Sequence, residues 1–310
     1  MQSIDSPVVL SVLSLLESSL FVALLYSPIT LALAVCFRVI NYPDLTCEGS
    51  AMVGAATAYV VLSHGGPAFA SLAASALAGA LAGGFTAILH THLRVSRLLS
   101  GIVTWAILYS ISIRLLGGRA NQPLSGSSIF DSLNPIRSAG GDLVITALVL
   151  VAIVSAWLAI STSREGRILR AVGDQHQFVT LVGRDYRRFL IGGLALANSM
   201  TGFCGGMVAQ YRKVCDVNMV AGLLVSGLAA LVLGEAIFAA RRLWQHALVC
   251  FVGTWAYNVA VGAFYFDWGS AEQGFFLPSD VRLLTGLLLI APAIVNFRLR
   301  GRYRLFAADW

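Results

Sequence analysis

A polar stretch between the first two apolar runs has the residue types that could contact a solute. It reads Asn41-Tyr-Pro-Asp-Leu-Thr-Cys-Glu-Gly-Ser50, and its polar members are Asn41, Asp44, Thr46, Glu48 and Ser50. One interpretation is a broken helix near the membrane interior, whose free backbone groups and helix N-terminus help to line a polar pathway. The alternative is a cytoplasmic turn beside Arg38, in which Thr46 or Ser50 caps the next helix.

Asn198 and Ser199 are polar residues inside a later apolar run. An amide at that depth is costly unless it is paired. Asn198 therefore either bonds a neighbouring helix or faces a polar pathway, and the sequence leaves both open.

Catalytic and metal-binding patterns are absent from the sequence. No Gly-rich P-loop occurs, and the single lysine, Lys213, does not lie in a Gly-rich turn. His90 and His92 stand two apart and do not share a helix face, and the cysteines form no CxxC pair. We therefore expect no catalytic residue, metal or cofactor in this chain. Without a P-loop, this chain cannot bind ATP in the P-loop manner.

The composition is that of a polytopic membrane protein. Hydrophobic residues make up 57% and charged residues 12% of the 310 residues, and the mean hydropathy is +0.79; soluble domains carry about 25% charged residues. Basic residues lie at the ends of apolar runs rather than on a soluble face, which argues against nucleic-acid binding.

The apolar runs predict an all-α transmembrane bundle of about 8–10 membrane segments, which we take as one domain over 1–310. Small residues at GxxxG spacing, Gly79 with Gly83 and Gly202 with Gly206, predict close helix packing. The runs are approximately Leu15–Ile40, Ser50–Ser63, Pro67–His90, Leu98–Leu116, Leu143–Ile160, Phe189–Tyr211, Met219–Ala240, Leu243–Phe266 and Val281–Phe297.

The longest charged interruption, Ser163–Arg188, is rich in arginine and has apolar residues at roughly helical spacing. Under the positive-inside rule it belongs in the cytoplasm, and alternation of the runs then also puts the C-terminus there. The segments 117–142 and 267–280 fall on the opposite side. They are either an outer vestibule that receives an extracytoplasmic binding protein or simple connectors.

Three stretches carry a resemblance to permease subunits of bacterial ATP-binding-cassette importers, in particular to the branched-chain amino acid and sugar permeases and their tryptophan/tyrosine-type group. The central stretch is Ser163-Arg164-x-Gly166-Arg167-x-Leu169-Arg170-Ala171-Val172-Gly173-Asp174, followed by Gly183. It resembles the family's cytoplasmic coupling loop, although Gln175 stands where relatives often have Asn. The other two are Asn41–Ala55 and Gly117–Leu124.

The resemblance implies a subunit of the bacterial inner membrane with defined partners. These would be an ATPase subunit that binds ATP and Mg, a solute-binding protein, and a second copy of the chain or a homologue. In the coupling loop it implies that arginines contact the ATPase, that Gly166 and Gly173 form turns, and that Leu169 and Val172 are apolar anchors. The expected coupling residues are Arg164, Gly166, Arg167, Leu169, Arg170, Ala171, Val172, Gly173, Asp174 and Gly183.

The solute follows from the resemblance alone, which implies an amino acid, possibly an aromatic one. The alternative function is an ATP-independent secondary transporter or channel for a small metabolite. Such a protein would carry buried ionisable residues for ion coupling, and the apolar runs have few.

Overall fold

The computed structural model describes residues 7–134, 138–181, 183–238, 240, 242–265 and 281–290. The described chain is almost entirely helical, which confirms the predicted all-α class. Seven of the described helices are long and apolar enough to cross a bilayer. The chain divides into two compact units, Leu31–Leu224 and a second one made of Met1–Thr30 with Val225–Trp310. The single domain over 1–310 therefore stays a prediction.

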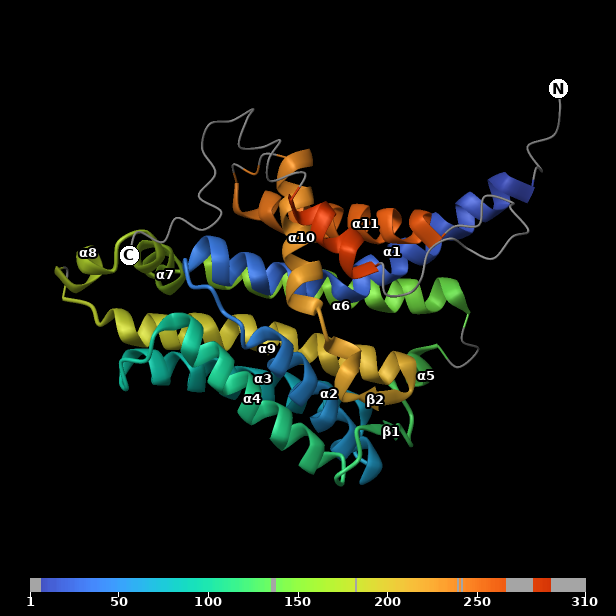
Figure 1. Cartoon of the computed structure of the whole chain (residues 1–310), viewed down its shortest axis with the longest axis horizontal. Coiled ribbons are helices and arrows are strands. Elements are labelled where there is room, and N and C mark those ends of the chain that lie inside the picture. Colours follow the sequence, from blue (N-terminus) through green and yellow to red (C-terminus); the bar gives the residue numbers. More distant parts are fainter. Residues whose placement is uncertain are drawn as a thin grey trace. The chain divides into compact units, whose positions relative to one another are not determined.

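The unit Leu31–Leu224, called the central unit below, begins in the last turn of α1 (Pro7–Ala34), and the π-helical turn η1 (Val35–Val39) follows. The apolar runs predicted α2, α3, α4 and α9 to within a few residues (Figure 1). The helices that follow η1 in this unit are α2 (Cys47–Ser63), α3 (Ala68–Thr91), α4 (Arg97–Leu115), α5 (Ile129–Leu133), α6 (Ala139–Thr162), α7 (Arg164–Asp174), α8 (His176–Leu181) and α9 (Tyr186–Arg212).

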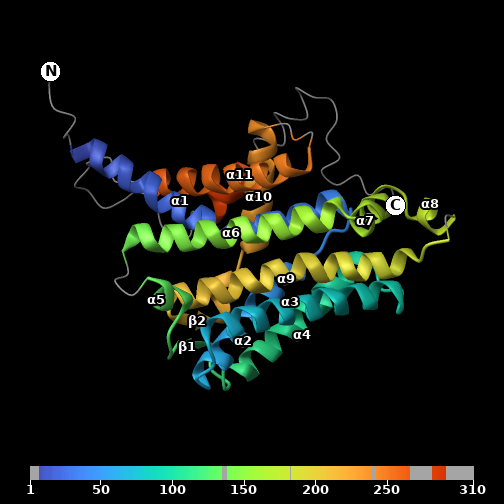
Figure 2. The same cartoon turned by 180° about the vertical axis from the view of Figure 1, so that it is seen from behind.

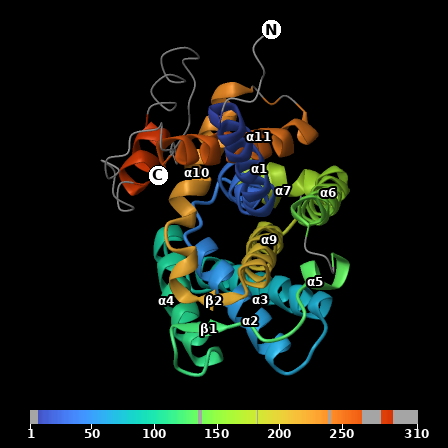
Figure 3. The same cartoon turned by 90° about the vertical axis from the view of Figure 1, so that its right-hand side faces the viewer.

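Helices α2, α3 and α9 form the core of the central unit, and α9 contacts the other two most extensively. Figure 2 shows α9 running alongside α3, and Figure 3 shows the same group of helices from one end. A Cβ on Gly79 would overlap the Asn198 carbonyl, and one on Gly202 would lie 2.5 Å from the Ser75 carbonyl oxygen. The predicted packing role of the GxxxG glycines is confirmed, because backbone meets backbone at these positions.

The segment 117–142 is tied to the end of α9. The strand β1 (Asn121–Pro123) pairs antiparallel with β2 (Val214–Asp216), with Gln122 opposite Cys215. The sequence did not predict this ribbon, since three-residue strands leave no periodic pattern. The turn η2 (Val217–Val220) follows β2.

An ion pair between Asp131 of α5 and Lys213 strengthens this attachment. Burial alone would raise the pKa of the Asp131 carboxyl, but hydrogen bonds from Lys213 and from Ser128 lower it to about 2. The Gln210 side chain accepts from the Ile129 N–H at 2.8 Å. The described part of the loop is therefore packed on the helical core. The second predicted outer loop, 267–280, lies outside the described residues, as does the C-terminal segment 291–310.

The second unit contains the first part of α1, most of α10 (Leu223–Ile237), α11 (Leu243–Tyr265) and a helix over Val281–Ile290. Glycine contacts hold α10 and α11 together, because a Cβ on Gly253 would overlap the Ala230 carbonyl. The hydroxyls of Thr30 and Thr254 join α1 to α11 at 2.8 Å.

We expect Gly79→Ala to destabilise the protein, because the added methyl would overlap the Asn198 carbonyl. Overpacking of this kind costs about 1–3 kcal/mol. The matched control is Gly84→Ala in the same helix, since a Cβ there meets nothing within 4 Å. Thermal unfolding in detergent checks the pair. Equal unfolding temperatures for the two variants would contradict the close approach of α3 and α9.

Candidate functional site

The central charged segment forms the amphipathic helix α7. The Ser163 hydroxyl caps it by accepting from the Gly166 N–H at 3.1 Å. Leu169 and Val172 are buried, while Arg164 and Asp174 are exposed and Ala171 is intermediate. The predicted apolar anchors therefore face the protein, and the charged ends of the helix face outward.

Gly166 and Gly173 lie inside α7, so the prediction that they form turns is wrong. They are places of close backbone approach. A Cβ on Gly166 would overlap the Ile160 carbonyl at the end of α6, and one on Gly173 would overlap the Val39 carbonyl at the end of η1. Gly183 does form a turn, since its φ of +77° lies in the left-handed region that favours glycine.

Two of the predicted ATPase-contacting arginines make contacts within the chain. Arg167 donates to the Thr162 carbonyl at 2.8 Å, and Arg170 donates to the Ser161 carbonyl at 2.7 Å. The last carbonyls of a helix have no intrahelical donor, so these guanidinium groups cap the C-terminus of α6. Arginine capping thus fixes the angle between α6 and α7.

The buried face of α7 rests on α9. A Cβ on Gly193 would lie 2.7 Å from Leu169 Cδ1 and 2.8 Å from Ile40 Cδ1, so both side chains fill the space beside this glycine. Sequence reasoning did not assign Gly193 a role, although the Gly192-Gly193 pair near the start of an apolar run was a visible signal. The helix α7 is therefore seated on α6, η1 and α9 together.

A buried polar network surrounds Asp44, a few residues along the chain from Ile40. Asp44 is 0% exposed, and both of its carboxylate oxygens accept hydrogen bonds. Oδ1 accepts from the Thr46 N–H at 2.8 Å, and Oδ2 accepts from Asn198 Nδ2 at 2.6 Å. Ser50 donates to Asn198 Oδ1 at 2.6 Å, and the Thr46 hydroxyl pairs with that of Thr86 at 2.8 Å. The segment between η1 and α2, the helix α2 itself, and the helices α3 and α9 all meet in this network.

The structure thus brings together four of the predicted pathway residues, Asp44, Thr46, Ser50 and Asn198. Neither Thr46 nor Ser50 caps α2 with its side chain. Thr46 occupies the N-cap position, but its hydroxyl makes no capping bond, and Ser50 lies inside the helix. The sequence left open whether Asn198 bonds a neighbouring helix or faces a polar pathway. In the structure its side chain bonds Ser50 of α2 and Asp44, which precedes α2.

The remaining candidates lie outside the network. The Asn41 carbonyl accepts from Arg97 at 3.1 Å, and Asn41 has a left-handed φ of 53°. Glu48 accepts from the Leu224 N–H at 3.1 Å and so caps the start of α10. In the part of the chain that the structure describes, the Ser199 hydroxyl bonds only the Leu196 carbonyl of its own helix, at 2.6 Å. Asn41 and Glu48 therefore contact the first turns of α4 and α10, whereas the Ser199 hydroxyl bonds within α9.

The segment between η1 and α2 is held along its length. The Tyr42 hydroxyl lies 2.6 Å from the Ser100 hydroxyl and donates to the Arg97 carbonyl at 3.2 Å. Val39 touches α7, and Asp44 bonds α9. A short chain of contacts therefore connects α7 to the polar network.

Two cysteines, which form no CxxC pair in the sequence, also face Asp44. Cys36 and Cys47 each place Sγ 3.9 Å from Asp44 Oδ2, and the three ligand atoms lie within 4.8 Å of one another. Two thiols and a carboxylate are a possible donor set for a soft metal ion. Both carboxylate oxygens already accept stronger hydrogen bonds, so the group is satisfied without an ion.

Comparison with known proteins supplies the family. Residues 15–292 match the family described as "Branched-chain amino acid transport system / permease component". The chain is 30% identical over 272 residues to the "Tyrosine transport system permease protein" of Clostridioides difficile (strain R20291), and the aligned region covers 87% of this chain and 87% of the relative. It is 23% identical over 253 residues to an uncharacterized protein of Rickettsia prowazekii (strain Madrid E), covering 80% of this chain and 88% of the relative. No solved structure matches this chain.

We expect Asn198→Leu to destabilise the central unit, because it leaves Asp44 Oδ2 and the Ser50 hydroxyl without their partner. An unsatisfied buried polar group costs about 1–3 kcal/mol. The control is Ser199→Ala on the next residue, whose hydroxyl bonds only its own helix. Unfolding in detergent compares the two variants. If Asn198→Leu is as stable as Ser199→Ala, the network does not hold the helices together.

Proposed function

This chain belongs to the family of permease components of branched-chain amino acid transport systems, and from that membership we propose that it forms the pathway of an ATP-driven importer. It is a multi-pass inner-membrane transport subunit rather than an enzyme. In the proposed complex, a separate ATPase subunit binds ATP and Mg. A solute-binding protein delivers the solute, and a second copy of the chain or a homologue completes the pathway. The C-terminus is cytoplasmic.

The observation that carries this proposal is the seating of α7. It is exposed on one side and packed on the other against three elements of the central unit through Gly166, Gly173 and Leu169. A partner that pushes the exposed side would move α7 together with η1 and α9, because packed backbones do not yield independently. Such a rigid-body displacement is a means of switching access from one side of a membrane to the other.

The proposed solute is an amino acid. The relative from Clostridioides difficile is named as a tyrosine transport permease, which supports an aromatic amino acid. The Asp44–Asn198 network supports the same class, since a carboxylate held beside a helix start can attract an ammonium.

Affinity purification in mild detergent tests the assembly. The tagged chain is taken from its native membrane, and the proteins that remain bound are identified and counted. We expect a P-loop ATPase at one copy per permease. A chain that comes alone, even after cross-linking, would favour an ATP-independent transporter or channel.

We expect Gly173→Ala to reduce ATP-driven amino-acid uptake by about tenfold, because the methyl would overlap the Val39 carbonyl and displace α7. A tenfold effect corresponds to about 1.4 kcal/mol, which overpacking readily supplies. The measurement is uptake into proteoliposomes that contain the assembled complex.

The control for this variant is Gly140→Ala in the first turn of α6, where a Cβ meets nothing within 4 Å. The ATPase should co-purify with both variants. Normal uptake by Gly173→Ala would show that the contact between α7 and η1 does not couple the two subunits.

A further inference from the structure

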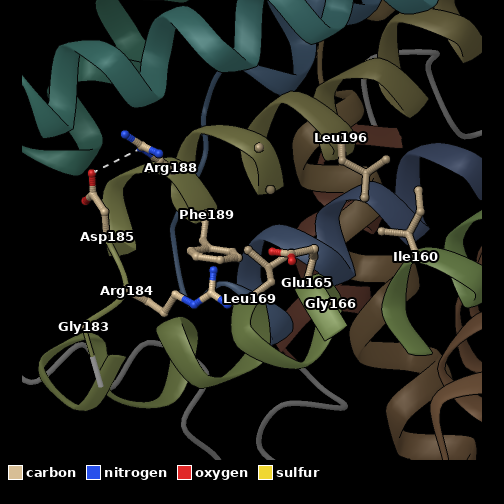
Figure 4. Close-up of a pocket in the computed structure, with 12 residues that line it drawn as sticks. Ile160, Glu165, Gly166, Leu169, Gly183, Arg184, Asp185, Arg188, Phe189 and Leu196 are labelled. Carbon is tan, nitrogen blue, oxygen red and sulfur yellow. Dashed lines mark ion pairs between the residues drawn. The ribbon is translucent and has the colours of Figure 1, made fainter. Parts of the chain in front are cut away.

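A cavity of about 800 Å³ lies beside α7 in the central unit. Its walls are the end of α6, the inner face of α7, the turn at Gly183 and the first turns of α9 (Figure 4). It is separate from the Asp44 network, and none of the residues that line it belongs to that network. The function proposed above leaves this cavity unused.

The lining is apolar at one end and charged at the other. Ile160 and Leu196 lie at one end, and Gly183, Arg184 and Asp185 lie at the opposite side in Figure 4. Ile160 and Leu196 belong to helices that are long and apolar enough to span a bilayer, whereas Arg184 and Asp185 belong to the polar segment between such helices. The cavity therefore crosses from a membrane-spanning region into an interfacial one, which suits an amphiphile.

The charges of the lining are balanced. Arg184 and Arg188 are opposed by Glu165 and Asp185. Asp185 and Arg188 form an exposed ion pair at 3.7 Å. Among the described residues Arg184 and Glu165 enter no ion pair, and Figure 4 shows both side chains reaching toward the space beside Phe189. An unpaired cation and an unpaired anion thus face one cavity.

We propose that this cavity binds a zwitterionic aminophospholipid. Arg184 contacts the phosphate, Glu165 accepts hydrogen bonds from the primary ammonium, and the acyl chains leave along Ile160 and Leu196. Guanidinium groups bind phosphate through charge-assisted hydrogen bonds. The balanced lining disfavours a purely anionic lipid, which would leave Glu165 facing a negative head group. The apolar end and the size of the cavity favour a lipid over a free amino acid.

A lipid in this position would brace α7. Gly166 and Leu169, which seat α7 on α6 and α9, also line the cavity. The proposal does not depend on the solute or on the ATPase, because lipid binding is measured on the isolated chain.

The test is native mass spectrometry of the purified chain, titrated with phosphatidylethanolamine, phosphatidylcholine and phosphatidylglycerol of identical acyl chains. We expect phosphatidylethanolamine to bind most tightly, since only its head group offers both a phosphate and hydrogen-bonding ammonium protons. Arg184→Gln and Glu165→Gln should each weaken its binding about tenfold, as loss of one hydrogen bond to a charged group does.

The matched control is Arg187→Gln, which removes an exposed arginine next to the cavity that does not line it. Thermal unfolding of each variant separates loss of binding from loss of fold. Equal binding of the three lipids, preference for phosphatidylglycerol, or displacement of phosphatidylethanolamine by free tyrosine would each overturn the proposal.

Discussion

The rest of the central unit depends on the need to satisfy one buried carboxylate. Asp44 is removed from solvent, and its oxygens are satisfied by Thr46 and by Asn198 on α9. An apolar surrounding makes these bonds expensive to break. They tie the segment after η1, the start of α2 and the middle of α9 into one body. Helices joined in this way move together or not at all.

Glycine contacts make that network possible. Asn198 can reach Asp44 and Ser50 only because α9 approaches its neighbours closely, with Gly202 against α3 and Gly205 against the Ala51 carbonyl of α2. A close contact between backbones also occurs at α7, where Gly173 lies against the Val39 carbonyl. Contact of backbone with backbone leaves no flexible side chain to absorb a displacement. The proposed transmission from α7 to the polar network rests on this stiffness.

Part of this structure could be predicted from the sequence. Apolar runs locate the long helices because length and hydropathy alone determine which segments can span a bilayer. GxxxG spacing identifies the packed face of α3 and α9. Long-range partners leave no local pattern, so the bonds of Asp44 to Asn198, of Arg170 to α6 and of Tyr42 to Ser100 appear only in three dimensions. For the same reason Gly166 and Gly173 were predicted as turns, since a glycine in a turn and one at a close contact look alike in a sequence.

The central claim is that α7 and the helical core of the central unit move as one body. Pulsed electron paramagnetic resonance tests it with spin labels at Arg164→Cys on α7 and Leu81→Cys on α3, both exposed positions. The five native cysteines are buried, so labelling is confined to the introduced sites. In the complex with its ATPase, we predict the same distance between the labels with and without bound nucleotide. A nucleotide-dependent change in that distance would mean that α7 moves independently of the core and would contradict the account.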